Sequence, residues 1–145
     1  MIEARRIQAR HPDLPGSLPE DRLRLLPDAA AWGSSAAVKV MVELGWPIDA
    51  RGGDWDASAL NHAVFSGDAE LTAFLLAHGA SYDEYHGYND NVYGTLSFAS
   101  IAETTPGGDW LACAKALVDA GSPIPEKRYD FPEDIAAYFQ ELRGP

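Results

Sequence analysis

The sequence contains a single cysteine, Cys113, among its 145 residues. One thiol cannot form an internal disulfide, so the fold must rely on a hydrophobic core, which a chain of this length can bury. A lone thiol also fits a reducing compartment. No apolar run is long enough to span a bilayer, and the first ten residues include a glutamate and lack the apolar stretch of a secretory signal. We therefore expect a soluble, cytoplasmic, single-domain protein.

Basic residues are also scarce. The chain has 11 lysines and arginines against 22 acidic residues, which gives a formal net charge of −11. A surface of that sign repels phosphate backbones and anionic lipid, so we expect neither nucleic acid nor a membrane as partner. The charge either keeps a small domain soluble or favours a partner protein with a basic surface.

Catalytic and metal-binding motifs are lacking as well. The sequence has no P-loop, nucleophile-elbow, zinc-protease or dinucleotide-binding motif. His62 and His78 are better explained by packing and helix capping than by acid–base catalysis. One acidic segment offers potential metal ligands, but without EF-hand spacing or paired cysteines: Asp83, Glu84, His86 and Asp90. We expect no enzyme activity, no metal and no cofactor.

The sequence does contain an internal repeat, the usual mark of stacked helical units. Six residues recur 34 positions later, and a third copy follows with displacements of 36 and then 42 residues. The matched sets are Leu26, Leu60 and Leu96; Ala29, Ala63 and Ala99; Gly33 and Gly67; Met41, Leu75 and Leu117; Gly45, Gly79 and Gly121; and Asp49 and Asp83. The additional residues of the third copy fall in segments 82–94 and 101–109, at turns, where insertions are tolerated.

The second half of each copy predicts a helix, because apolar residues recur three and four positions apart over 35–44, 69–78 and 110–119. Asp68 and Asp109 are placed to cap two of these helices, as is Ser34 or Ser35 for the other. Gly45, Gly79 and Gly121 are placed to end them. Three columns of side chains would then form a continuous core: Ala37, Leu71 and Cys113; Val40, Phe74 and Ala116; Met41, Leu75 and Leu117.

The middle copy resembles the ankyrin repeat. Residues 58–63 have the sequence S-A-L-N-H-A, against the consensus T-P-L-H-x-A, and the Gly67-Asp68 pair and the segment 75–80 (L-L-A-H-G-A) follow. The third copy retains 95–99 (T-L-S-F-A), and the first retains only 26–29 (L-P-D-A). The resemblance covers roughly residues 20–125.

This resemblance implies an all-α ankyrin-repeat solenoid, built of stacked antiparallel helix pairs with protruding loops. We expect an N-terminal arm at 1–20, repeats at about 21–53, 54–87 and 88–125, and a C-terminal cap at 126–145. The cap would be a helix over 132–143 that begins near Pro132. Its apolar face would comprise Ile135, Ala136, Tyr138, Phe139 and Leu142.

In ankyrin proteins the loops and first helices form a concave face that commonly binds proteins. The matching positions here are candidate partner-binding residues: Trp32, Asp54, Trp55, Phe65, Tyr88, Asp90, Asn91 and Tyr93. Large aromatic side chains suit such a role because they bury much area with few rotors. Alternatively, Trp32 and Phe65 pack between repeats, and the tyrosine-rich segment 82–94 folds on itself.

We therefore expect a non-enzymatic interaction module, either an adaptor or an inhibitor of a basic protein. An immunity or antitoxin protein that blocks a nuclease would be one example. An alternative is a structural spacer or capping segment of a larger repeat protein, and a third is a loop that binds a small ligand or ion. The sequence leaves the oligomeric state open.

Overall fold

The computed structural model describes residues 23–126 and 128–144, and this part of the chain is mostly helical. The expected arm at 1–20 lies outside the described residues. Two short strands, β1 (Arg51–Gly52) and β2 (Ala57–Ser58), pair antiparallel as a hairpin. The helices are α3 (Leu25–Ala31), α4 (Ser35–Glu43), α5 (Ala59–Phe65), α6 (Ala69–Ala77), α7 (Val92–Ala102), α8 (Trp110–Asp119) and α9 (Glu133–Arg143).

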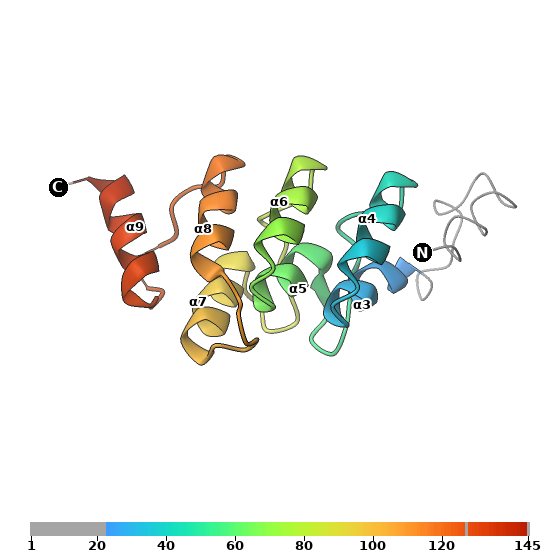
Figure 1. Ribbon diagram of the computed structural model, residues 1–145, viewed down its shortest axis with the longest axis horizontal. Coiled ribbons are helices and arrows are strands. Elements are labelled where there is room, and N and C mark those ends of the chain that lie inside the picture. Colours follow the sequence, from blue (N-terminus) through green and yellow to red (C-terminus); the bar gives the residue numbers. More distant parts are fainter. Residues whose placement is uncertain (1–22, 127, 145) are drawn as a thin grey trace, which may run out of the picture.

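The helices are arranged in two rows (Figure 1). In one row α3 contacts α5 and α5 contacts α7, and in the other α4 contacts α6, α6 contacts α8 and α8 contacts α9. Helix pairs therefore follow one another in chain order, with α3–α4 at one end and α9 at the other.

The predicted helix ends are confirmed in most places. Asp68 accepts a hydrogen bond from the Leu71 amide at 3.0 Å, and Asp109 caps α8 in the same way. The glycines that follow α4, α6 and α8 all adopt positive φ, as a helix exit often requires. The serine cap predicted for α4 is wrong, because Ser34 occupies the N-cap position without a side-chain hydrogen bond.

The insertion predicted at 101–109 partly lengthens α7 and partly forms a turn that returns to α5. Glu103 ends α7 in the left-handed conformation. The Trp110 indole then donates a hydrogen bond to the Val64 carbonyl at 2.9 Å, and the Asp109 amide donates to the Gly67 carbonyl at 2.9 Å. The end of the insertion is thus fixed to the C-terminal end of α5.

The core lies between the two rows of helices. Among the predicted columns, Leu71, Leu75, Cys113 and Leu117 are fully buried, whereas Phe74 and Ala116 stay partly exposed at the edge of the core. Cys113 is therefore a small buried side chain, and burial raises the pKa of its thiol to about 11.

Helix α9 packs against α8 through part of the predicted apolar face. Ile135 and Phe139 are buried, and the Phe139 ring lies 5.9 Å from the Tyr93 ring, centroid to centroid. Ala136 and Leu142 are exposed, so the buried face is narrower than the sequence indicated.

Candidate binding site

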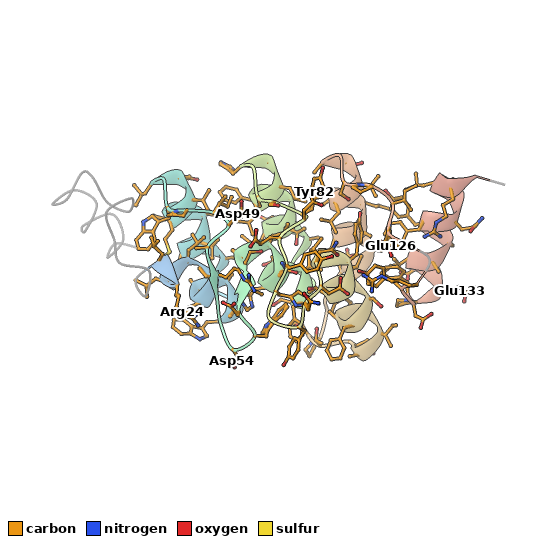
Figure 2. The ribbon with its side chains drawn as sticks, turned by 180° about the vertical axis from the view of Figure 1, so that it is seen from behind. Arg24, Asp49, Asp54, Tyr82, Glu126 and Glu133 are labelled. Carbon is orange, nitrogen blue, oxygen red and sulfur yellow. The ribbon has the colours of Figure 1, made fainter. Side chains whose placement is uncertain are left out.

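The β1–β2 hairpin is held against the first helices by buried or half-buried polar contacts. The carboxylate of Asp28 accepts a hydrogen bond from the Gly53 amide at 2.7 Å. His62 Nε2 lies 2.9 Å from the Gly52 carbonyl. These contacts fix the loop that carries Asp54 and Trp55, and Asp54 lies at its tip (Figure 2).

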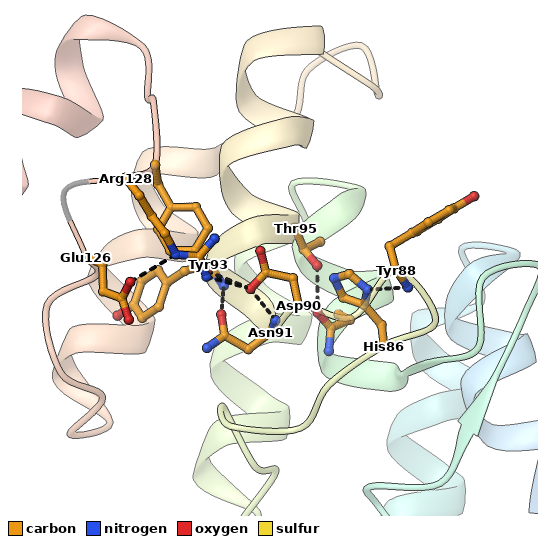
Figure 3. Close-up of polar contacts among 10 residues, drawn as sticks. His86, Tyr88, Asp90, Asn91, Tyr93, Thr95, Glu126 and Arg128 are labelled. Carbon is orange, nitrogen blue, oxygen red and sulfur yellow. Dashed lines mark hydrogen bonds and ion pairs between the residues drawn. The ribbon is translucent and has the colours of Figure 1, made fainter.

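The second loop, between α6 and α7, folds on itself and on the hairpin. The His86 amide donates a hydrogen bond to the Asp90 carbonyl at 2.9 Å. The Tyr88 amide donates to His86 Nδ1 at 3.1 Å (Figure 3). The Gly87 amide donates to the Trp55 carbonyl at 2.9 Å. A carbon atom at the Cβ position of Gly87 would lie 2.6 Å from that same carbonyl oxygen, so the approach requires glycine.

Trp55 is the centre of an aromatic cluster. Its ring centroid lies 4.9 Å from that of His86, 5.0 Å from His62, 5.5 Å from Phe65 and 6.5 Å from Tyr88. The Tyr88 ring is inclined to the indole by only 25°. Residues from two loops and from α5 therefore meet around one side chain.

Beside this cluster is a cavity of about 580 Å³, which we call the Trp55 pocket. Its walls are largely aromatic, and two carboxylates contribute to its lining. It is lined by Asp54, Trp55, Phe65, His86, Tyr88, Asp90, Gly94, Thr95 and Phe98. This volume falls in the range of ordinary small-ligand sites, which likewise combine apolar walls with a few polar groups.

Asp90 is the most constrained carboxylate of the pocket. Its Oδ1 accepts hydrogen bonds from the Tyr129 hydroxyl at 2.6 Å and the Asn91 amide at 2.8 Å, and from Arg128 at 3.3 Å. Burial opposes ionisation, but these hydrogen bonds outweigh it and lower the pKa of Asp90. The side chain is therefore an anion at neutral pH.

The two histidines of the cluster are buried, and desolvation lowers the pKa of both His62 and His86. Each is neutral at pH 7 and carries its proton on one nitrogen. Because His86 Nδ1 accepts from the Tyr88 amide, we assign its proton to Nε2. Both rings therefore act as positioning groups for the loops.

The structure brings five of the eight sequence-predicted site residues together in the pocket. They are Asp54, Trp55, Phe65, Tyr88 and Asp90. The predicted alternative, in which the loop folds on itself, also holds in part, since the loop is internally hydrogen-bonded. The same folding of the loop that forms these internal hydrogen bonds also places Tyr88 and Asp90 in the pocket lining.

The other three candidates lie elsewhere. Trp32 is 75% exposed at the C-terminal end of α3 and does not line the pocket. Asn91 caps α7 by accepting from the Tyr93 amide at 3.0 Å. Tyr93 is only 4% exposed and its hydroxyl contacts the Ser122 hydroxyl. The expectation of an accessible Tyr93 is corrected, because this ring packs in the core against Phe139.

Sequence reasoning did not select His86, Gly94, Thr95 or Phe98 as partner-binding residues. Phe98 is 62% exposed, and its ring stacks on Phe65 at a centroid distance of 6.3 Å. Its helical neighbours Leu96 and Ala99 are buried, so Phe98 is an apolar residue on the face of α7 opposite to the core. An apolar side chain outside the apolar face of the predicted helix was the sequence signal that could have identified Phe98.

Within 23–126 and 128–144, no group of three or more histidine, cysteine, aspartate or glutamate side chains is placed to hold a metal ion. In the same ranges, none of the helices has the length and apolar character needed to cross a membrane.

The comparisons with known proteins give no family assignment: no protein-family model matches the chain, and no curated protein matches it significantly.

Proposed function

We propose that this chain is a helical-repeat protein of the ankyrin type that binds another protein through the Trp55 pocket. The ordered succession of helix pairs supports the repeat assignment. So does the placing of the consensus-like residues: Ser58 caps α5, and Gly67 and Gly79 make the turns after α5 and α6. The β1–β2 hairpin corresponds to the protruding loop that the resemblance implies.

The observation that carries the binding proposal is the exposure of large aromatic side chains around a preformed cavity. Tyr88 is 78% exposed and Phe98 is 62% exposed, and both line the pocket. Exposed apolar groups gathered around a hollow are typical of interaction sites, whereas singly exposed ones are ordinary. Because the loops are held by backbone hydrogen bonds, little ordering would oppose binding.

The net charge favours a basic partner, which is consistent with an adaptor or with an inhibitor that masks a basic surface. No step of this proposal involves catalysis. The buried histidines and the hydrogen-bonded Asp90 are explained by their contacts within the loops.

Site-specific photo-crosslinking in cells tests the proposal. A photoreactive phenylalanine analogue would replace Phe98 in one variant and Trp32 in a matched control, since both residues are exposed aromatics and only Phe98 lines the pocket. We expect a crosslinked partner protein from position 98, and a loss of that product when Tyr88→Ala is added.

Equal products from positions 98 and 32 would overturn the pocket as the binding site. If neither position gives a product, the spacer interpretation would replace the binding proposal. Circular dichroism of each variant confirms that the helices are retained.

A further inference from the structure

The Trp55 pocket combines aromatic walls with carboxylates, the two features that attract a cation. The faces of aromatic rings carry partial negative charge and bind cations, with tryptophan the strongest. An apolar side chain would desolvate Asp54 without pairing it, and an anion would be repelled. We infer that the pocket takes the alkylammonium end of a lysine side chain from the partner protein, an inference that rests on the proposed function and specifies its ligand chemistry.

Both carboxylates have acceptor capacity to spare. Asp54 is exposed, and no ion pair of this residue is found among the described parts of the chain. All three hydrogen bonds of Asp90 go to Oδ1, and over the same residues none is found to Oδ2. Oδ2 lies on the side of α7, where a Cβ on Gly94 would approach it to 2.5 Å, so glycine at position 94 lets this carboxylate lie against the helix backbone.

The nearby arginines are already paired. Arg51 forms an ion pair with Asp56 at 3.0 Å, and Arg24 lies 3.9 Å from the same carboxylate. Arg128 pairs with Glu126 at 2.9 Å and with Asp90 at 3.3 Å. These carboxylates offset the charges of the arginines. The carboxylate of Asp54, which has no ion pair among the described residues, therefore gives the surroundings of the pocket a net negative charge, the same sign as that of the whole chain.

The orientation of the rings favours an ammonium group over a guanidinium group. Relative to the indole of Trp55, the rings of Tyr88, Phe65 and His86 are inclined by 25°, 47° and 67°. Only the Tyr88 ring is nearly parallel to the indole, and rings at several inclinations suit a compact cation, whereas a planar guanidinium is best held between parallel rings.

The surface beside the pocket favours a side chain that belongs to a polypeptide. A second hollow of about 410 Å³ shares Asp90, Gly94 and Phe98 with the Trp55 pocket and continues past the exposed Ile101 to Asp130. A lysine in the first hollow would lay its apolar stem against Phe98, and its backbone would reach the second hollow. A free amine would leave the second hollow unused.

The first test uses n-butylammonium, which has the structure of the end of a lysine side chain, and its neutral analogue 1-butanol. In ¹H–¹⁵N NMR spectra at constant ionic strength, n-butylammonium should shift the Trp55 indole resonance in a saturable manner in the millimolar range. The Trp32 indole, exposed outside the pocket, is the internal control. Equal saturable shifts with butanol would overturn the requirement for a cation.

Variants then separate the two sources of attraction. Tyr88→Ala and Asp54→Asn should each weaken n-butylammonium binding by about two- to fivefold, the range of exposed cation–π and ion-pair contributions. Both residues are exposed, so their replacement leaves the core intact. Trp32→Ala should bind as the unmodified chain does. Unchanged affinity in both pocket variants would overturn the assignment of the pocket.

A displayed library of random peptides tests the assignment to a polypeptide and to lysine. Selection on the unmodified chain should enrich lysine, and selection on Tyr88→Ala should lose that enrichment. Enrichment of arginine, or of apolar residues without lysine, would overturn the ligand chemistry. Crosslinking from position 98 would still stand in that case, so the failure of this inference is distinguishable from the failure of the proposed function.

Discussion

The Thr95 hydroxyl donates a hydrogen bond to Oδ1 of Asn61 at 2.7 Å, and both side chains are buried between α5 and α7. The amide group of Asn61 in turn donates to Ser58 Oγ at 3.1 Å. In the proposed ankyrin-type register, Asn61 occupies the position where the consensus has histidine. A buried polar side chain therefore ties one helix pair to the next while its own hydrogen bonds are satisfied.

The first prediction follows from this contact. Thr95→Val keeps the shape of the side chain but leaves Oδ1 of Asn61 buried without its donor, so the free energy of unfolding should fall by about 1–3 kcal/mol. Urea denaturation followed by circular dichroism measures the change. Thr105→Val, in the turn after α7, is the control and should alter stability by less than about 0.5 kcal/mol. Equal stability of the two variants would contradict a structural role for the bond.

Local sequence signals predicted the helices and their ends, because those features depend on neighbouring residues. Asp68 and Gly79 act within one turn of their own helix. Ser34 had the right residue type, but its hydroxyl forms no bond with the helix backbone. Tyr93 was misjudged because its burial depends on contacts with Ser122 and Phe139, which lie far along the chain.

The residues of the site were predictable only in part, because some of them depend on long-range contacts. The repeat register placed Trp55 and the tyrosine-rich loop on one side of the molecule. It did not show that the Gly87 amide bonds to the Trp55 carbonyl, which brings His86 and Tyr88 onto the indole. The insertion in the third copy also concealed Phe98, since its exposure depends on how α7 is rotated against α5.

The second prediction concerns the close approach of Gly67 to the inserted turn. Gly67 has φ +66°, and a Cβ there would lie 2.6 Å from the Cα of Gly108. Gly67→Ala should therefore destabilise the chain through both backbone strain and a clash. Gly79→Ala is the matched control, because φ is +92° and no atom lies within 4 Å of the added carbon.

Backbone strain alone should cost Gly79→Ala about 1 kcal/mol. Gly67→Ala should lose at least about 2 kcal/mol, since the clash is with backbone and cannot be relieved by a rotamer change. Thermal unfolding measured under one set of conditions gives both values. A loss no larger for Gly67→Ala would show that the inserted turn moves away freely.

The third prediction is a loss of stability in mild acid. Burial lowers the pKa of His62 and His86 in the folded chain, so the unfolded chain binds more protons as the pH falls below about 6.5. The stability contributed by the neutral rings is fully present above that pH and decreases as the pH falls toward the lowered values. The pKa of Asp90 is also lowered in the folded chain, so the stability that its carboxylate contributes is lost only at more acidic pH, as the pH falls below the ordinary pKa of 3.8.

Urea midpoints measured at pH 7.5 and pH 5.5 test this linkage. Stability should be lower at pH 5.5, and the difference should shrink in a His62→Gln variant, whose side-chain amide can still donate to the Gly52 carbonyl. If His62→Gln keeps the full difference, the destabilisation in acid does not arise from His62.

The fourth prediction concerns α9 as the cover of the C-terminal end. Phe139 is buried and touches Tyr93, Phe131 and Tyr138, with ring centroids between 5.1 and 5.9 Å away. Phe139→Ala should lower the free energy of unfolding by about 3–5 kcal/mol, as large-to-small changes in a core do. Leu142→Ala, on the same helix but 42% exposed, should cost far less.

The shape of the Phe139→Ala transition tells how α9 is coupled to the rest. In stacked structures each unit is stabilised mainly by its neighbours, so an exposed end destabilises the adjacent pair first. If α9 unfolds with the whole chain, fluorescence and circular dichroism will give one shared transition at lower urea. Two separate transitions would mean that α9 detaches while α3–α8 stay folded.

Detachment of α9 should also affect the Trp55 pocket, because Tyr93 packs on Phe139 and directly precedes Gly94 in α7. Binding of n-butylammonium to the pocket should then weaken in the first transition.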